Sequence, residues 1–197
     1  IHTARFMPDG HILATDFSAD QLLLYKREGD KVIPQGVAGR LLAGSAPRHI
    51  EHSAGWRYVY VMSERAGAVT GFSNKAGKLT RIQTIASDSV GGRGGADIHM
   101  SPDGRYIYAS NRLKADGISI FKENTMNGKL KKAGYQLTGI HPRNFAITPN
   151  GKYLLCACRD SNTIQIYERN QDTGMLTLQP TTIDLKKPVC IKLLEVE

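Results

Sequence analysis

The sequence predicts an all-β protein, a β-propeller built from four-stranded antiparallel blades. The first observation is an internal repeat, because similar segments begin at His2, Arg48, Ala96 and Arg143, which are 46, 48 and 47 residues apart. A period of this length is typical of propeller blades. The second observation is a Pro-Asp-Gly or related glycine turn early in each repeat, followed by alternating apolar residues. The third is the lack of any helical periodicity in the chain.

Each repeat predicts four strands in the same order. A short first strand leads into a tight turn such as Pro102-Asp103-Gly104, where glycine supplies the positive φ. A second strand of alternating β-forming residues follows, as in residues 106–109. After a polar bend, the third strand ends on an aromatic side chain, at Tyr25, Phe72, Phe121 and Tyr167. A further glycine turn then opens the fourth strand, at Gly29, Gly77, Gly128 and Gly174.

The tail of the chain differs from the repeats. Its sequence, "KKPVCIKLLEVE", predicts a lone apolar strand at residues 188–194. In a ring-shaped propeller such a strand completes a blade that begins at the other end of the chain. We therefore expect one partial propeller domain over residues 1–197, closed by this strand.

Composition excludes several classes of partner. The net charge is +8, but lysine and arginine are scattered, so we expect a small anionic substrate and no nucleic acid. No apolar run approaches the roughly 20 residues of a membrane helix, so we expect no membrane partner. The odd set of three cysteines, Cys156, Cys158 and Cys190, argues against a disulfide framework and favours a reducing, cytoplasmic location.

Four segments resemble a known family. They are "PRHIEH", "GADIHMSPDGRYIYASNR", "HPRNFAITPNGKYLL" and "PVCIKLL", and they are similar to the lactonase family of seven-bladed β-propellers. That family includes propeller-type 6-phosphogluconolactonases and carboxy-cis,cis-muconate lactonising enzymes. The resemblance implies that about four of seven blades are present, as the C-terminal portion. The expected partners are the missing N-terminal blades or another copy of the chain.

Ionisable residues gather at one edge of the predicted blades. In an antiparallel meander, the start of the first strand and the end of the second lie at the same edge of the sheet. Arg48, Asp97 and Arg143 lie at first-strand starts, whereas Glu64 and Arg112 lie at second-strand ends. The turns at the opposite edge hold mainly Pro, Asp, Asn and Gly. This asymmetry predicts a functional site at the mouth of the central channel.

The resemblance implies a catalytic set of His2, Arg48, Glu64 and Arg112. Lactone hydrolysis needs a group that moves protons, which Glu64 or a histidine can supply, and cations that hold the oxyanion, which the arginines can supply. We expect further substrate contacts at the same edge, from His49, Asp97, His99, Asn111, His141 and Arg143. Arg159 departs from the Asn-Gln expected there in the family. No metal or cofactor is expected, because no residues stand at ligand spacing.

The leading prediction for function is hydrolysis of a sugar lactone, with 6-phosphogluconolactone as the substrate that the resemblance implies. One alternative is a muconate-type lactone cyclase. The other is a non-catalytic propeller that binds a ligand or a protein. The presence of Glu64 beside the cations favours an enzyme. The glycine-rich segment "GGRGGAD" from Gly91 is interpreted as a mobile lip beside the site.

Overall fold

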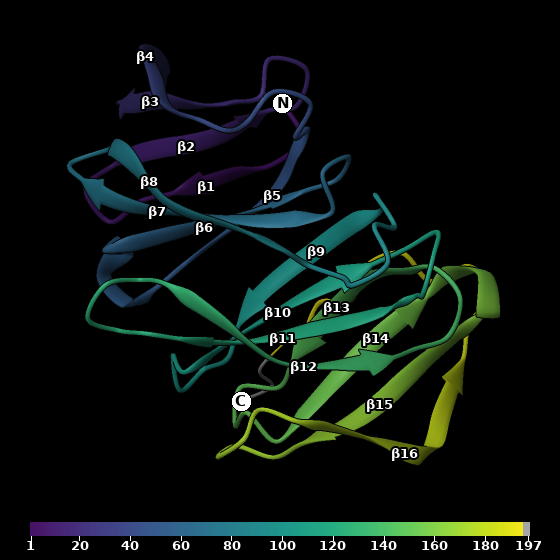
Figure 1. Ribbon diagram of the computed structural model, residues 1–197. Helices are drawn as coiled ribbons and strands as arrows, with labels where there is room; N and C mark the ends of the chain where they lie inside the picture. The colour runs from purple at the N-terminus through teal and green to yellow at the C-terminus, as the bar shows by residue number, and fades with distance from the viewer. Residues whose placement is uncertain (195–197) are drawn as a thin grey trace.

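A computed structural model describes residues 1–194 of the chain. It contains four sheets, each with four antiparallel strands that follow one another in chain order (Figure 1). Each sheet corresponds to one sequence repeat, so the predicted all-β propeller architecture is confirmed. We number the blades one to four along the chain.

The strands have the following bounds. The first blade contains β1 (Ala4–Phe6), β2 (His11–Asp16), β3 (Gln21–Glu28) and β4 (Lys31–Arg40). The second contains β5 (Pro47–His52), β6 (Tyr58–Ser63), β7 (Ala68–Lys75) and β8 (Lys78–Ala86). The third contains β9 (Gly95–Met100), β10 (Tyr106–Asn111), β11 (Gly117–Glu123) and β12 (Leu130–Leu137). The fourth contains β13 (Pro142–Ile147), β14 (Tyr153–Cys158), β15 (Thr163–Arg169) and β16 (Leu176–Asp184).

The first turn of three blades is closed by a side chain. The Oδ1 atoms of Asp9, Asp103 and Asn150 each accept a hydrogen bond from the backbone N–H two residues later, at 3.1, 3.1 and 3.0 Å. Such a turn, followed by a glycine with positive φ, joins two antiparallel strands at low cost. The second blade replaces it with a short 3₁₀ turn, η1 (Ala54–Trp56). These turns all lie at the edge opposite the predicted site.

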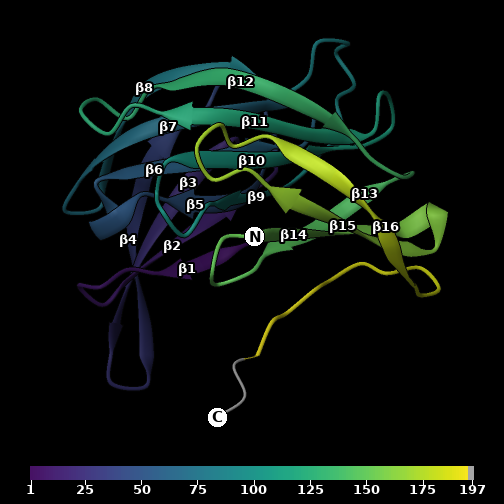
Figure 2. The ribbon, with the colours of Figure 1, turned by 90° about the horizontal axis from the view of Figure 1, so that it is seen from below.

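The blades pack face to face along an arc (Figures 1 and 2). Figure 2 shows the fourth strands toward the outside of the arc, while β5 contacts β9 and β9 contacts β13 on the inside. Apolar side chains from neighbouring blades form the core, and Leu13, Val61, Ile107 and Leu154 are fully buried in it. The first strands therefore stand on a rigid support around the channel.

The terminal segment corrects one prediction. Residues 188–194 do not form a strand. The Ile191 N–H donates to the side-chain oxygen of Asn144 at 2.6 Å, and not to a backbone carbonyl of β13. A strand requires a ladder of backbone hydrogen bonds with a neighbour, and this segment has no such ladder within residues 1–194. Over the same residues, no helix has the length and apolar character needed to span a membrane.

Candidate active site

The predicted strand-end register is present in the structure. Pro47 pairs with Ser63, Gly95 with Asn111, and Pro142 with Cys158. One residue beyond each second strand, the N–H groups of Glu64, Arg112 and Arg159 donate to carbonyls just before the first strands, at 2.9, 2.9 and 3.0 Å. The same backbone bond thus holds three ionisable residues at one edge of three successive blades.

The four residues of the expected catalytic set form one cluster. Arg48 Nη1 donates to Glu64 Oε2 at 2.7 Å, and Arg112 Nη2 lies 3.1 Å from the same oxygen. His2 Nε2 lies 2.8 Å from Arg48 Nη1. The cluster therefore joins the segment before β1, the second blade and the third blade. The predicted convergence of Arg48, Glu64 and Arg112 in one place is observed.

Backbone carbonyls hold the two guanidinium groups in place. Arg48 Nε donates to the Ala96 carbonyl at 2.9 Å, and Arg112 donates to the carbonyls of Gly94 and Gly95 at 3.1 and 3.0 Å. Both arginine side chains are only 6% exposed, whereas Glu64 is 30% exposed. Backbone carbonyls thus hold the two guanidinium groups, while the Glu64 carboxylate between them is accessible to solvent.

The cluster of Arg48, Arg112 and Glu64 carries a net positive charge. Burial opposes ionisation of Glu64, but the guanidiniums of Arg112 and Arg48 lower its pKa below the usual value. Burial and the nearby Arg112 charge lower the pKa of Arg48. Arg143, half-buried on β13, also lowers the pKa of both Arg48 and Arg112 by like-charge repulsion. An anionic ligand would relieve this repulsion.

His49, Asp97 and His99 form a second group in the channel. Asp97 is 2% exposed, and its carboxylate lies 2.6 Å from His49 Nδ1 and 3.0 Å from His99 Nε2. It also accepts hydrogen bonds from the Asn144 amide and from the backbone N–H of Phe145. These residues line a cavity of about 400 Å³ together with Glu51 and Cys190.

The charges of this second group follow from its contacts. Burial opposes ionisation of Asp97, yet His99 and His49 lower the pKa of its carboxyl. His99 lies between two carboxylates, since its Nδ1 is 3.6 Å from Glu51 Oε2. Although burial disfavours the cation, Asp97 and Glu51 raise the pKa of His99 to about 9. His99 is therefore an imidazolium at neutral pH that links the second and third blades.

Two other predicted contacts are placed differently. The Asn111 side chain is fully buried, and its amide donates to the Ala109 carbonyl and the Ser119 hydroxyl, both at 3.2 Å. It points into its own blade, so the prediction that Asn111 binds substrate is wrong. His141 is buried between Arg112 and Asp160, with its nitrogens 3.4 Å from each. Burial, Arg159 and Arg112 lower the pKa of His141 to about 4.

The positive charge of Arg159 is compensated locally. Its guanidinium donates twice to Asp160, at 3.0 and 2.9 Å, and Lys187 approaches the same carboxylate at 2.9 Å. Sequence reasoning missed this pairing, as it missed Glu51 and Asn144 in the channel. Both channel residues could have been found by extending the first-strand register beyond its first residues, because alternate positions of that strand face the channel.

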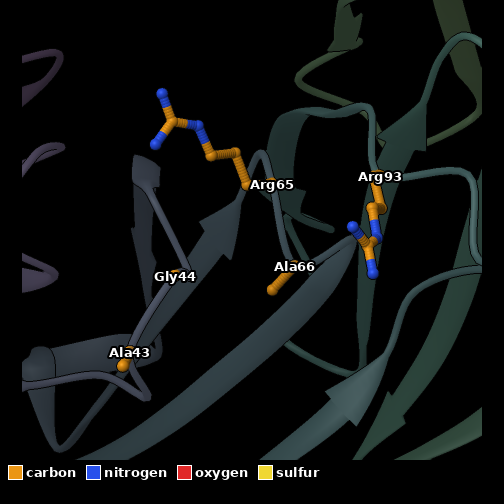
Figure 3. A pocket seen from close by; sticks show the side chains of 5 residues that line it. All are labelled: Ala43, Gly44, Arg65, Ala66 and Arg93. Atoms are coloured by element: carbon orange, nitrogen blue, oxygen red, sulfur yellow. The ribbon is translucent and has the colours of Figure 1, made fainter.

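A second cavity lies outside this cluster. It measures about 500 Å³ and is lined by Ala43, Gly44, Arg65, Ala66 and Arg93. Figure 3 shows the Arg65 and Arg93 side chains extending in different directions, and Arg65 packs over the ring of Phe17 at 5.4 Å.

The glycine-rich loop beside this second cavity is built around one carboxylate. Asp88 accepts hydrogen bonds from the N–H groups of Val90, Gly91 and Gly92, at 2.9, 2.6 and 3.0 Å. Three such bonds hold the loop in a defined turn, so the interpretation of it as a mobile lip is not supported by its contacts. In residues 1–194, no three histidine, cysteine, aspartate or glutamate side chains are grouped so as to hold a metal ion.

Comparison with known proteins gives consistent matches. The family model "Lactonase, 7-bladed beta-propeller" matches residues 1–193. The 6-phosphogluconolactonase of Bacillus subtilis is 32% identical over 98% of this chain, and that of Formosa agariphila is 35% identical over 91%. The chain spans 57% and 54% of the lengths of these two relatives.

Solved structures agree with this assignment. A Bacteroides uniformis protein, provisionally assigned as a 6-phosphogluconolactonase, is 54% identical with a TM-score of 0.91, over 96% of this chain and 56% of that one. The periplasmic gluconolactonase of Pseudomonas aeruginosa is 25% identical with a TM-score of 0.92, over 100% of this chain and 57% of that one. This chain belongs to the lactonase family of seven-bladed β-propellers.

Proposed function

We propose that the protein containing this chain hydrolyses a sugar lactone, with 6-phosphogluconolactone as substrate. The observation that carries the proposal is the Glu64 carboxylate held between Arg48 and Arg112 at the axial edge of the blades. Relatives that carry the name 6-phosphogluconolactonase support this choice of substrate.

The arrangement suits attack of water on an ester carbonyl. As the carbonyl carbon becomes tetrahedral, its oxygen gains negative charge, and fixed donors that already point at that oxygen lower the barrier. Arg48 and Arg112 are such donors, because backbone carbonyls and Glu64 hold them before substrate arrives. His2 supports Arg48 from the side of the first blade.

Arg143 is the residue proposed to bind the phosphate. It lies close enough to Arg48 and Arg112 to affect their pKa values, and its fork of donors suits a phosphate group. His49 would form part of the wall of the substrate site. The cytoplasmic location expected from the cysteines stays a prediction, since one relative is named as a periplasmic protein.

The test is direct. The full-length protein is mixed with 6-phosphogluconolactone, and formation of 6-phosphogluconate is followed against spontaneous opening of the ring. Gluconolactone without phosphate serves as the comparison substrate. We expect turnover well above the spontaneous rate and a lower KM for the phosphorylated lactone. A rate equal to the spontaneous one with both lactones would reject the proposal.

A further inference from the structure

We infer that His49, oriented by Asp97, is the general base that activates the attacking water. The inference rests on the proposed lactone hydrolysis and names the group that this reaction requires. In this assignment His49 and Asp97 carry out the proton transfer. Arg48 and Arg112 stabilise the negative charge that develops on the carbonyl oxygen.

The geometry of His49 is that of an oriented base. Its Nδ1 lies 2.6 Å from Asp97 Oδ1, which fixes the ring and places the proton on that nitrogen. Nε2 is then left with a free lone pair, and it has no hydrogen-bond partner within residues 1–194. The side chain is 24% exposed and lines the cavity of about 400 Å³. A water in that cavity can reach Nε2.

Asp97 is itself held firmly. The N–H groups of Ile98 and Phe145 donate to its two oxygens at 3.0 and 3.2 Å, and the Asn144 amide donates as well. These bonds come from the third and fourth blades, while His49 belongs to the second. A carboxylate fixed in this way keeps one tautomer of the imidazole and stabilises the imidazolium that forms after proton transfer.

The other histidines near the site lack an available lone pair. His2 Nε2 faces an Arg48 donor at 2.8 Å, and His141 Nε2 faces an Arg112 donor at 3.4 Å. Both nitrogens of His99 face carboxylates, at 3.0 and 3.6 Å, so this ring holds both protons. Of these histidines, His49 is the one left with a ring lone pair that no donor within residues 1–194 occupies.

Glu64 is poorly placed to take a proton. One of its oxygens receives both guanidinium groups, at 2.7 and 3.1 Å. Protonation would remove the charge that holds two mutually repelling cations together. Its lowered pKa reflects the same attraction to Arg112 and Arg48. Glu64 therefore positions the arginines, and the base must be sought elsewhere.

His49 lies within reach of the charge-stabilising cluster. It follows Arg48 directly on β5, and its ring centroid is 5.1 Å from that of His2, which contacts Arg48. A lactone whose carbonyl oxygen points to Arg48 would present its carbonyl carbon toward water beside His49. Base and oxyanion donors thus come from adjacent residues of one strand.

The proposed step balances as follows. Water attacks the carbonyl carbon, forming a C–O bond, while its proton passes to His49 Nε2 and the carbonyl electrons move to the oxygen. When the carbonyl re-forms, the bond from this carbon to the ring oxygen breaks. The imidazolium returns the proton to that oxygen. The products are a carboxylic acid and a free hydroxyl group, and His49 is neutral again.

Several charged groups surround His49. From the first blade these are His2 and Arg5, from its own strand Glu51, from β9 Asp97 and His99, and from the terminal segment Lys192.

The experiment removes the imidazole and supplies it again. In the full-length protein, His49→Ala should lower kcat for 6-phosphogluconolactone by roughly 10²–10⁴-fold with little change in KM. Added imidazole should restore part of the rate in proportion to its concentration, because the cavity has room for it. Asp97→Asn, with His49 still present, should lower kcat at least about tenfold.

His52→Ala is the matched control. His52 lies on the same strand but at the other end, stacked on Trp56 at 4.0 Å. This variant should keep the wild-type kcat and show no response to imidazole. A His49→Ala protein with kcat within about twofold of wild type, or one that imidazole does not rescue, overturns the inference. Wild-type protein without lactonase activity would instead reject the proposed function.

Discussion

One carboxylate oxygen organises the cationic half of the proposed site. Glu64 Oε2 receives both Arg48 and Arg112, and the two guanidiniums would repel each other without it. The cluster therefore combines strong local interaction with a net positive charge that suits an anionic substrate. Removal of this one charge should change catalysis more than it changes the fold.

Glu64→Gln tests this role. The amide keeps the shape but loses the charge, so the arginines should shift from the position in which they hold the oxyanion. We expect kcat for 6-phosphogluconolactone to fall by roughly 10²–10³-fold, as for loss of an oxyanion donor, with a smaller effect on KM. The assay must subtract spontaneous ring opening. Glu28→Gln, an exposed carboxylate beside Lys26, is the control, and equal kcat values for both variants would contradict this role.

Arg143→Ala tests recognition of the phosphate. A charge-assisted hydrogen bond contributes about 1.5–3 kcal/mol, so KM for 6-phosphogluconolactone should rise about tenfold to a hundredfold. KM for gluconolactone should change much less. Arg105→Ala, beside the turn at the opposite edge, should leave both values unchanged. If Arg143→Ala changes KM equally for both lactones, Arg143 does not bind the phosphate group.

His99 should make stability depend on pH. Its pKa is raised to about 9 in the folded protein, against about 6.5 in an unfolded chain. The resulting stabilisation is complete below about pH 6.5 and is lost as the pH rises through 9. Denaturant unfolding at pH 6.5 and 9.5 should show a larger loss of stability for wild type than for His99→Gln. Equal losses would argue against an imidazolium at this position.

Among the strands and turns, the same hydrogen-bonded contact between neighbouring blades is repeated along the chain. Tyr60 donates to the Gly128 carbonyl at 3.0 Å, and Tyr108 donates to the Gly174 carbonyl at 2.7 Å, one repeat further on. In each case a second-strand tyrosine reaches the glycine turn between the third and fourth strands of the next blade. Both glycines have positive φ, and a Cβ would clash with the ring of the tyrosine two residues before the bonding one, Tyr58 at Gly128 and Tyr106 at Gly174.

Gly174→Ala should weaken the contact between the third and fourth blades. The residue has φ of 76°, and its Cβ would clash with the ring of Tyr106. Left-handed strain of about 1–2 kcal/mol adds to overpacking of about 1–3 kcal/mol. Gly104→Ala, with φ of 69° and nothing within 4 Å, should show the strain alone. Urea unfolding should find Gly174→Ala clearly less stable, and equal stability of the two variants would count against the contact.

At the scale of the whole molecule, the middle blades are covered and the end blades are open (Figure 1). Every residue of β6 and β10 is buried. In contrast, β3 and β14 leave positions exposed, and apolar side chains such as Val37 and Ile183 of the end blades are 45% exposed. Apolar faces of this kind usually bind a partner.

The 197-residue chain alone should therefore associate and show little lactonase turnover. We expect its open blade faces to bind another copy, aggregate, or bind the blades that complete the longer relatives, of which it spans 57% and 54%. Sedimentation and lactonase assays on the isolated chain, with the full-length protein as reference, provide the measurement. A stable monomer with full turnover would show that four blades suffice.

The repeat, the hairpins and the edge at which the site lies follow from local patterns in the sequence. Turn chemistry and alternation are local, and antiparallel pairing converts them into a register that places Arg48 and Glu64 at the same edge of one hairpin. These predictions depend on neighbouring residues along one hairpin. The expected catalytic set was instead named from the resemblance to the lactonase family, which the sequence segments carry.

The contacts that each side chain makes at that edge became known only from the folded arrangement of the blades. Asn111 turns into its blade, Asp160 neutralises Arg159, and Asp97 joins His49 to the fourth blade. The terminal segment likewise meets the Asn144 side chain in place of a strand ladder. The contacts of Asp97 and Asn144 join groups 47 or 48 residues apart, whose distance and orientation are set by the packing of the blades and not by any local pattern.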